Sequence, residues 1–334
     1  NVIIDDQFIG KINGLKLELD LKKGALETDI KSLKKAARQT VGPELERRIR
    51  KITESDTIYL KDDFKIYWDN CAIAKISSGK NYLNPGLELI VDEILEYAQK
   101  IKLTMFLEKW LKNKIDLVLK SLIELKNSKE KNSSIKALAY QLYENNGVVK
   151  REQVNEYLKN LGQNERKILR EQGVKFGRYH IFLFKLFKPE AVSLRTLLWK
   201  NFHQKYFNLK PPTYGLNFLD DKKSQDKDFM LLCGFEKFDN LYVRIDILER
   251  LFVQIINSNS DEKKEIKVIP EMLNLLGCNK ENFKKLLKNM GYRLIVKEKD
   301  LFFKYLPNKK PKKINKKITN KESPFKVLKQ LNLN

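Results

Sequence analysis

The most informative stretch of the chain is NERKILREQGVKFGRYHIFLFKLFKPEAVSLRTLLW, which occupies residues 164–199. Basic residues alternate in it with apolar and aromatic ones, while Gly173 and Gly177 keep the backbone permissive. Basic side chains beside aromatic rings are typical of surfaces that bind a nucleic-acid strand, because phosphates attract cations and bases stack on rings. The stretch therefore predicts these nucleic-acid-binding residues: Arg166, Arg170, Lys175, Phe176, Arg178, Tyr179, His180 and Lys188.

The aromatic residues of this stretch have a second possible role. Phe176, Tyr179 and Phe182 can stack on bases or fill the core around Trp199, and core packing is the commoner role of a single ring. Arginine and lysine are harder to bury, so they are the better binding candidates. His180 titrates near neutral pH, but its immediate sequence offers no carboxylate, serine or cysteine to complete a catalytic site. We therefore expect a structural or base-contacting histidine.

Several short blocks of the chain, taken in order, carry a family resemblance. The first is Arg-x-x-Leu-Arg, then Gly-Val-x-Phe-Gly-x-Tyr-His-Ile and Leu-x-Lys-Pro, within residues 166–189. Further blocks lie at residues 243–251, 270–278, 291–293 and 323–325. Together they resemble the region C-terminal to the motor in bacterial relatives of the mitochondrial degradosome RNA helicase, a DExH-box ATPase.

The resemblance implies that the chain is the C-terminal, post-motor region of an ATP-dependent RNA helicase. Its expected function is that of a cytoplasmic RNA-binding accessory region that guides single-stranded RNA. Degradosome assemblies also suggest a ribonuclease as a protein partner. The first alternative is a stand-alone winged-helix DNA-binding protein, and the second is a degradosome-type scaffold.

The nucleotide-binding motifs of a helicase motor are missing from this sequence. No G-x-x-x-x-G-K-[ST] loop is present, and Ser78-Gly79-Lys80 lacks the upstream glycines. The run LELIVDE at residues 87–93 imitates the apolar strand and Asp-Glu pair that hold magnesium in helicases, but no phosphate loop precedes it. ATP and magnesium are therefore expected only in a motor outside this chain. We expect no cofactor, no metal site and no catalytic residue in the chain itself.

The composition of the chain is strongly basic. Its 334 residues include 66 Lys and Arg against 43 Asp and Glu, a net charge of +23. Such an excess favours a polyanionic partner, although a lysine-favouring genome would produce it too. Three widely spaced cysteines and two histidines lack metal-ligand spacing. The sequence contains no apolar run of twenty residues, so no membrane partner is expected.

The periodicity of apolar residues predicts a mainly α fold with small β-hairpins and meanders (α+β), built from several modules. Residues 1–86 are expected to form a helical pair, broken at Gly42-Pro43, and a small β-meander with strands at 57–60, 64–68 and 72–76. Residues 87–210 should form a helical domain that carries the basic and aromatic stretch, with helices at 87–126, 135–144 and 148–161.

Residues 226–306 form the third predicted module. We expect a strand at 241–244 and a helix capped by Asp246, with Glu249 completing a capping box. A helix at 270–276, a turn at Gly277, a second helix capped by Asn279, and a hairpin of strands 292–297 and 301–305 make a winged-helix-like order. Its predicted RNA-binding residues are Arg244, Lys284 and Lys288, although a solvated charged face explains the lysines nearly as well.

Residues 307–334 are expected to form a basic, disordered tail. Phe325, Leu328 and Leu331 recur at a spacing of three after Ser323-Pro324, as in a short helix that folds on a partner. These residues are the predicted partner-binding motif.

Overall fold

The structure is a computed structural model that describes residues 2–4, 7–20, 27–127, 132–204, 207–221, 226–258, 265–297 and 300–305. Helices alternate with small antiparallel sheets throughout these ranges, which confirms the predicted α+β class. The predicted tail at residues 307–334 lies outside them, and so do Phe325, Leu328 and Leu331. No helix among the described residues combines the length and the apolar character needed to cross a bilayer.

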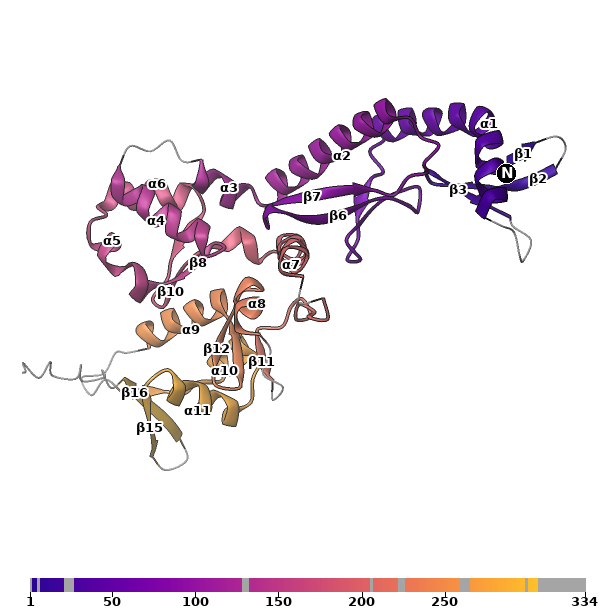
Figure 1. Cartoon of the computed structure of the whole chain (residues 1–334). Helices are drawn as coiled ribbons and strands as arrows, with labels where there is room; N and C mark the ends of the chain where they lie inside the picture. The colour runs from indigo at the N-terminus through magenta and orange to yellow at the C-terminus, as the bar shows by residue number, and fades with distance from the viewer. Residues whose placement is uncertain are drawn as a thin grey trace, which may run out of the picture.

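The N-terminal part of the chain forms an elongated arm (Figure 1). In it, helix α2 (Tyr97–Val118) lies along a β-meander, and helix α1 (Glu27–Glu54) lies beside the N-terminal strands. The strands of the meander are β4 (Tyr59–Leu60), β5 (Lys65–Trp68), β6 (Cys71–Asn81) and β7 (Asn84–Leu89). A second sheet contains β1 (Val2–Ile4), β2 (Gln7–Asn13) and β3 (Lys16–Leu19).

Helix α1 corrects the predicted break at Gly42-Pro43, because it runs through both residues as one helix. The buried residues Val41, Leu45 and Ile49 continue one apolar stripe across the proline. Proline removes one backbone hydrogen bond inside a helix. Burial of this stripe against the arm's core outweighs that loss.

The predicted helices at residues 87–126 and 148–161 are only partly present. Residues 87–89 belong to strand β7, and the helices of the first region are α2 and α3 (Lys120–Lys126). In the second region, residues 148–150 form strand β8, because Val148 and Val149 pair with Phe182 and Ile181. β-branched residues favour such a strand, and the helix that follows is short.

The carboxylate that imitates a helicase motif has a structural role. Asp92, in the run LELIVDE, is buried and accepts hydrogen bonds from the backbone N–H groups of Leu17 (3.2 Å) and Ile94 (3.1 Å). It therefore ties the segment after the meander to the sheet formed by β1, β2 and β3.

Beyond the arm, three units follow one another with the same order of strands. Each begins with a helix and a strand and ends with a hairpin, and in each sheet the last strand lies between the other two. The first unit contains α4 (Ser133–Glu144), β8 (Val148–Lys150), η1 (Arg151–Val154), α5 (Asn155–Lys159), α6 (Gln163–Glu171), β9 (Val174–Phe176) and β10 (His180–Leu183).

The second unit follows the short helix η2 (Phe184–Phe187) and contains α7 (Pro189–His203), β11 (Phe218–Asp220), α8 (Lys227–Leu232), β12 (Phe235–Phe238) and β13 (Leu241–Arg244). The third contains α9 (Ile245–Asn257), β14 (Ile266–Lys267), α10 (Pro270–Leu276), α11 (Lys280–Asn289), β15 (Tyr292–Lys297) and β16 (Asp300–Tyr305). Figure 1 shows α7 between the arm and the other elements of the second unit.

The local predictions for the third unit are largely confirmed. Gly277 ends α10 in the left-handed conformation, with a φ of 68°, and the Asn279 side chain caps α11 by accepting the N–H of Asn282 at 2.8 Å. The predicted capping box on α9 is wrong, because Arg244 stands at the N-cap and Asp246 bonds to its guanidinium instead. The winged-helix assignment stays a prediction.

Arg195 fastens the first unit to the second. Its side chain is fully buried on α7 and donates to the carbonyl oxygens of Asn146 (2.9 Å), Leu186 (2.6 Å) and Leu232 (3.0 Å). Burial lowers the pKa of this guanidinium to about 10. These carbonyls come from the α4–β8 turn, from η2 and from α8, so one side chain fixes three segments.

Candidate nucleic-acid interface

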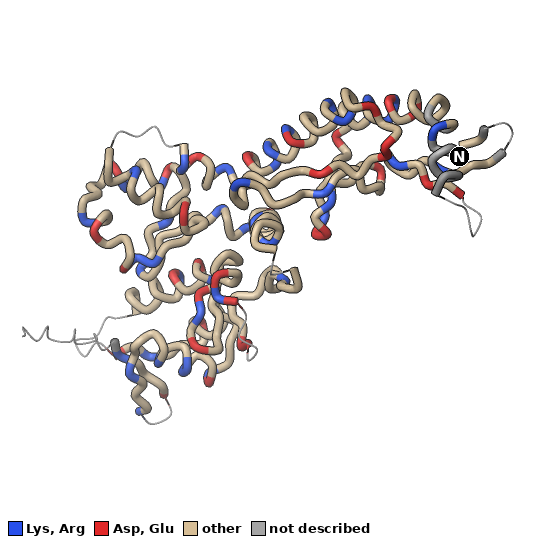
Figure 2. The backbone as a smooth tube through the Cα atoms, viewed as in Figure 1, with Lys and Arg blue, Asp and Glu red and all other residues tan. Residues whose placement is uncertain are grey.

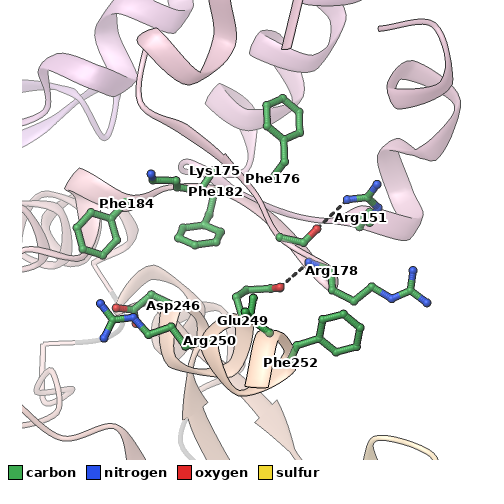
Figure 3. Close-up of a pocket in the computed structure, with 12 residues that line it drawn as sticks. Arg151, Lys175, Phe176, Arg178, Phe182, Phe184, Asp246, Glu249, Arg250 and Phe252 are labelled. Carbon is green, nitrogen blue, oxygen red and sulfur yellow. Dashed lines mark hydrogen bonds between the residues drawn. The ribbon is translucent and has the colours of Figure 1, made fainter. Parts of the chain in front are cut away.

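The turn between β9 and β10 meets helix α9 through a single carboxylate. Glu249 accepts the backbone N–H of Arg178 (Figure 3). It also accepts the N–H groups of Tyr179 and His180, at 2.9 Å each. Three consecutive donors thus converge on one side chain of the third unit. The guanidinium of Arg151 holds the same turn from the other side by donating to the Gly177 carbonyl at 2.8 Å.

The Glu249 carboxylate lies so close to the backbone at Gly177 that only glycine fits at this position. A Cβ atom at this position would lie 2.3 Å from the Glu249 carboxyl carbon, well inside contact distance. A side chain here is therefore incompatible with the three hydrogen bonds.

Changing Gly177 to alanine should weaken this contact. We expect Gly177→Ala to lower the free energy of unfolding by about 2 kcal/mol, because the displaced carboxylate leaves three N–H donors, including that of the buried His180, without this partner. The measurement is urea unfolding followed by circular dichroism. Gly42→Ala is the matched control: nothing lies within 4 Å of its Cβ position in α1, so it should be neutral or stabilising. An equal effect of the two substitutions would contradict the steric argument.

His180 lies where the three units meet. Its side chain is 3% exposed, and Nε2 lies 3.0 Å from Glu236 on β12, whose other oxygen accepts from Lys150 on β8 at 2.7 Å. Its Nδ1 lies 3.6 Å from Glu249 on α9. Burial lowers the pKa of His180, but the interactions with Glu236 and Glu249 outweigh it and raise the pKa above its ordinary value. Burial alone would raise the pKa of Glu236. The hydrogen bonds from His180 and Lys150 have the larger effect, so the pKa of Glu236 lies below its ordinary value.

The raised pKa of His180 predicts a loss of stability as pH rises above about 6.5. The folded-state pKa of His180 is raised, so its stabilising effect is complete below the unfolded pKa of about 6.5 and disappears as pH rises through the folded pKa. The charged groups that face it are Glu236, Glu249 and Lys150. We expect the urea midpoint of the wild-type chain to fall over this range and that of His180→Gln to stay nearly flat. Parallel curves for the two proteins would contradict this role of His180.

A cavity of about 720 Å³ opens where the β9–β10 hairpin faces α9. Its lining combines four basic residues with four phenylalanines (Figure 3). The residues are Arg151, Lys175, Phe176, Gly177, Arg178, Phe182, Phe184, Asp246, Glu249, Arg250, Phe252 and Val253. Two of the rings form cation–π contacts. The Arg170 guanidinium lies 5.6 Å from the centroid of Phe176, and the Arg178 guanidinium lies 5.5 Å from that of Phe252.

The acidic residues of this cavity are engaged within the protein. Asp246 binds Arg244 through both oxygens, at 2.6 and 2.8 Å, and Glu249 holds the turn. None of the carboxylates that the structure describes forms a salt bridge with Lys175, Arg178 or Arg250, whose side chains are exposed. Across the whole chain, by contrast, basic and acidic residues are intermixed (Figure 2).

Six of the predicted site residues lie in or beside two neighbouring hollows. Lys175, Phe176 and Arg178 line the cavity, and Arg170 lies beside it over Phe176. Tyr179 and His180 line a second hollow of about 360 Å³, which shares Arg151 and Arg178 with the first. Burial and the Tyr292 hydroxyl, 3.3 Å away, raise the pKa of Tyr179.

The other candidates lie elsewhere or have partners in the protein. Arg166 donates to the backbone carbonyls of Leu158 (3.0 Å) and Leu161 (3.2 Å), so its guanidinium fastens α6 to α5. Lys188 is exposed at the N-cap of α7. Arg244 binds Asp246, Lys284 binds Glu281 at 2.8 Å, and Lys288 is exposed on α11.

Sequence patterns did not indicate several residues of the cavity. Arg151, Glu249 and Phe252 come from η1 and α9, outside the stretch that predicted the site, and Phe184 of η2 lies inside that stretch but was not among the predicted residues. One signal was available: α9 carries Phe252 and the 55% exposed Val253 beside its buried stripe, more apolar surface than its own core needs.

No protein family matches this chain, and no curated protein or solved structure is significantly similar to it. The resemblance to the helicase region therefore stays a prediction based on the motifs. Among the described residues, no three His, Cys, Asp or Glu side chains are grouped as ligands of a metal ion.

Proposed function

We propose that this chain is the RNA-binding accessory region of an ATP-dependent RNA helicase and holds single-stranded RNA in the cavity between the β9–β10 hairpin and α9. The observation that supports this best is the lining: exposed cations and phenylalanine rings surround one cavity whose carboxylates are engaged inside the protein. The order of sequence motifs supports the helicase context. ATP binding and hydrolysis belong, in this proposal, to a motor outside the chain.

The chemistry of the cavity suits an unpaired strand better than a small anion. Base stacking on an aromatic side chain contributes about 1–3 kcal/mol and tolerates any sequence, because every base has a π face. Lys175, Arg178 and Arg250 can neutralise the phosphates between the bases. The net charge of +23 adds long-range attraction for any polyanion.

Reversing the charge of the cavity tests this function. The triple variant Lys175→Glu/Arg178→Glu/Arg250→Glu should bind a fluorescent single-stranded RNA of twelve nucleotides about tenfold more weakly or worse. Its dependence on salt should also be shallower, by about 0.7 in the logarithmic slope for each phosphate that the variant no longer neutralises. The measurement is fluorescence anisotropy at several salt concentrations.

The matched control makes the same charge change far from the cavity. Lys102, Lys109 and Lys112 are exposed on α2 in the arm, and their replacement by glutamate should leave most of the affinity in place. Equal losses of affinity in the two triple variants would mean that only net charge matters. Unchanged affinity in a folded cavity variant would remove this cavity from the proposal.

A second candidate function, duplex binding through α11, rests on the third unit. Its helices α10 and α11 are followed by the hairpin of β15 and β16, which is the order of elements on which the winged-helix prediction rests. In helix-turn-helix proteins the second helix of the pair enters the major groove. The corresponding helix here is α11, whose Lys280, Lys285 and Lys288 are exposed.

A variant of α11 separates the two candidates. Under the proposed function, Lys285→Glu/Lys288→Glu should bind the single-stranded RNA within about threefold of the wild type, since neither lysine lines the cavity. If duplex binding by α11 is the main function, wild-type chain should prefer a duplex DNA of equal length and this variant should lose that preference. Competition between the two labelled nucleic acids measures both outcomes. Docking of a ribonuclease through residues 323–334 remains an expectation from the sequence.

A further inference from the structure

The carboxylate of Glu249 occupies the position of a bound anion. The backbone N–H groups of Arg178, Tyr179 and His180 converge on it from one turn. Successive N–H groups that point into one concavity form a common binding site for phosphate and other anions. Here a side chain of another unit fills that concavity.

A buried ring nitrogen beside the turn has no hydrogen-bond partner. His180 Nδ1 is shielded from solvent, forms no hydrogen bond, and lies 3.6 Å from the nearer Glu249 oxygen, which is beyond hydrogen-bond distance. Nδ1 thus faces the Glu249 carboxylate as an ion pair but makes no hydrogen bond with it. An anion with more oxygen atoms, spread over a tetrahedron, can reach the three N–H groups and Nδ1 together.

Two cationic side chains surround the same turn. Arg151 and Arg178 line both the 720 Å³ cavity on one side and the 360 Å³ hollow on the other. Glu249 lies in the wall of the larger cavity with its side chain 11% exposed, so the occupied concavity borders on the space proposed for RNA.

We propose that the turn at residues 177–180 is a binding site for a phosphodiester group of the RNA strand, and that Glu249 is an internal competitor for it. This inference rests on the proposed function, because the strand in the cavity supplies the phosphate. When a phosphate enters, Glu249 rotates out and the N–H groups, Nδ1 and the Arg178 guanidinium bind the new anion. RNA binding thereby releases the contact between the first and third units.

A purely structural role of Glu249 leads to the opposite expectation. If the carboxylate only fastens the turn, its removal disorders the wall of the cavity and weakens binding. If it competes, its removal strengthens binding, because the apparent affinity is reduced by the fraction of molecules in which the site is blocked.

Replacing Glu249 with its neutral isostere distinguishes these roles. In Glu249→Gln, one carboxylate oxygen becomes an NH₂ group that cannot accept from the turn. We expect this variant to bind the twelve-nucleotide single-stranded RNA about tenfold more tightly than the wild type. The charge-matched control is Glu152→Gln, an exposed residue of η1 in the neighbouring hollow, for which we expect less than about a twofold change. Unchanged or weaker binding by a folded Glu249→Gln protein would overturn the proposal.

Measurements on the wild-type chain keep the proposal testable if the variant does not fold. The amide resonances of Arg178, Tyr179 and His180 should shift on titration with the RNA and, at higher concentration, with inorganic phosphate. RNA that binds without moving these amides would overturn the phosphate site and leave the proposed function standing. Amides that respond to inorganic phosphate in a chain that does not bind RNA would support an anion site, identify free phosphate as its source and contradict the proposed function.

Discussion

The arrangement of the three units depends on the burial of charged groups at their junction. His180, Glu236 and Glu249 come from three different units and are nearly shielded from water. A charge taken out of water must find a partner, because the cost of leaving it alone exceeds the cost of most single packing defects. Each of these groups therefore restricts where the other units can lie. The buried Arg195, with its three carbonyl partners, does the same between α7 and its neighbours.

The carboxylates at this junction also determine the charge of the cavity beside it. Glu249 and Asp246 would make the cavity acidic if they faced its interior as free carboxylates. They are instead bound to backbone N–H groups and to Arg244. The exposed charged groups that remain in the lining are Lys175, Arg178 and Arg250, beside the exposed ring of Phe184 and the half-buried rings of Phe176 and Phe252. Because Glu249 and Asp246 bind groups of the protein itself, they do not pair with the cations that line the cavity.

The sequence correctly predicted those features that depend on one residue or on one short stretch, such as a helix cap. Asn279 caps α11 as expected, and the basic and aromatic stretch around Phe176 does line a cavity. Local signals failed where distant contacts decide the outcome. Helix α1 continues through Pro43 because its buried stripe packs on the arm, and residues 148–150 form a strand because β10 lies beside them. Glu249 was expected to cap a helix, yet its partners lie about seventy residues earlier in the chain, and no spacing rule connects them.

The three units also show how one topology can have different roles. The helix before the hairpin is α6 in the first unit and α11 in the third, and both display exposed basic residues such as Arg170 and Lys288. The corresponding α8 of the second unit has only six residues, and its Phe229, Met230 and Leu232 are buried. A helix that must bury so much of its short surface has little left to present. The second unit therefore buries most of its helix in packing contacts, whereas the first and third units keep exposed basic residues on theirs.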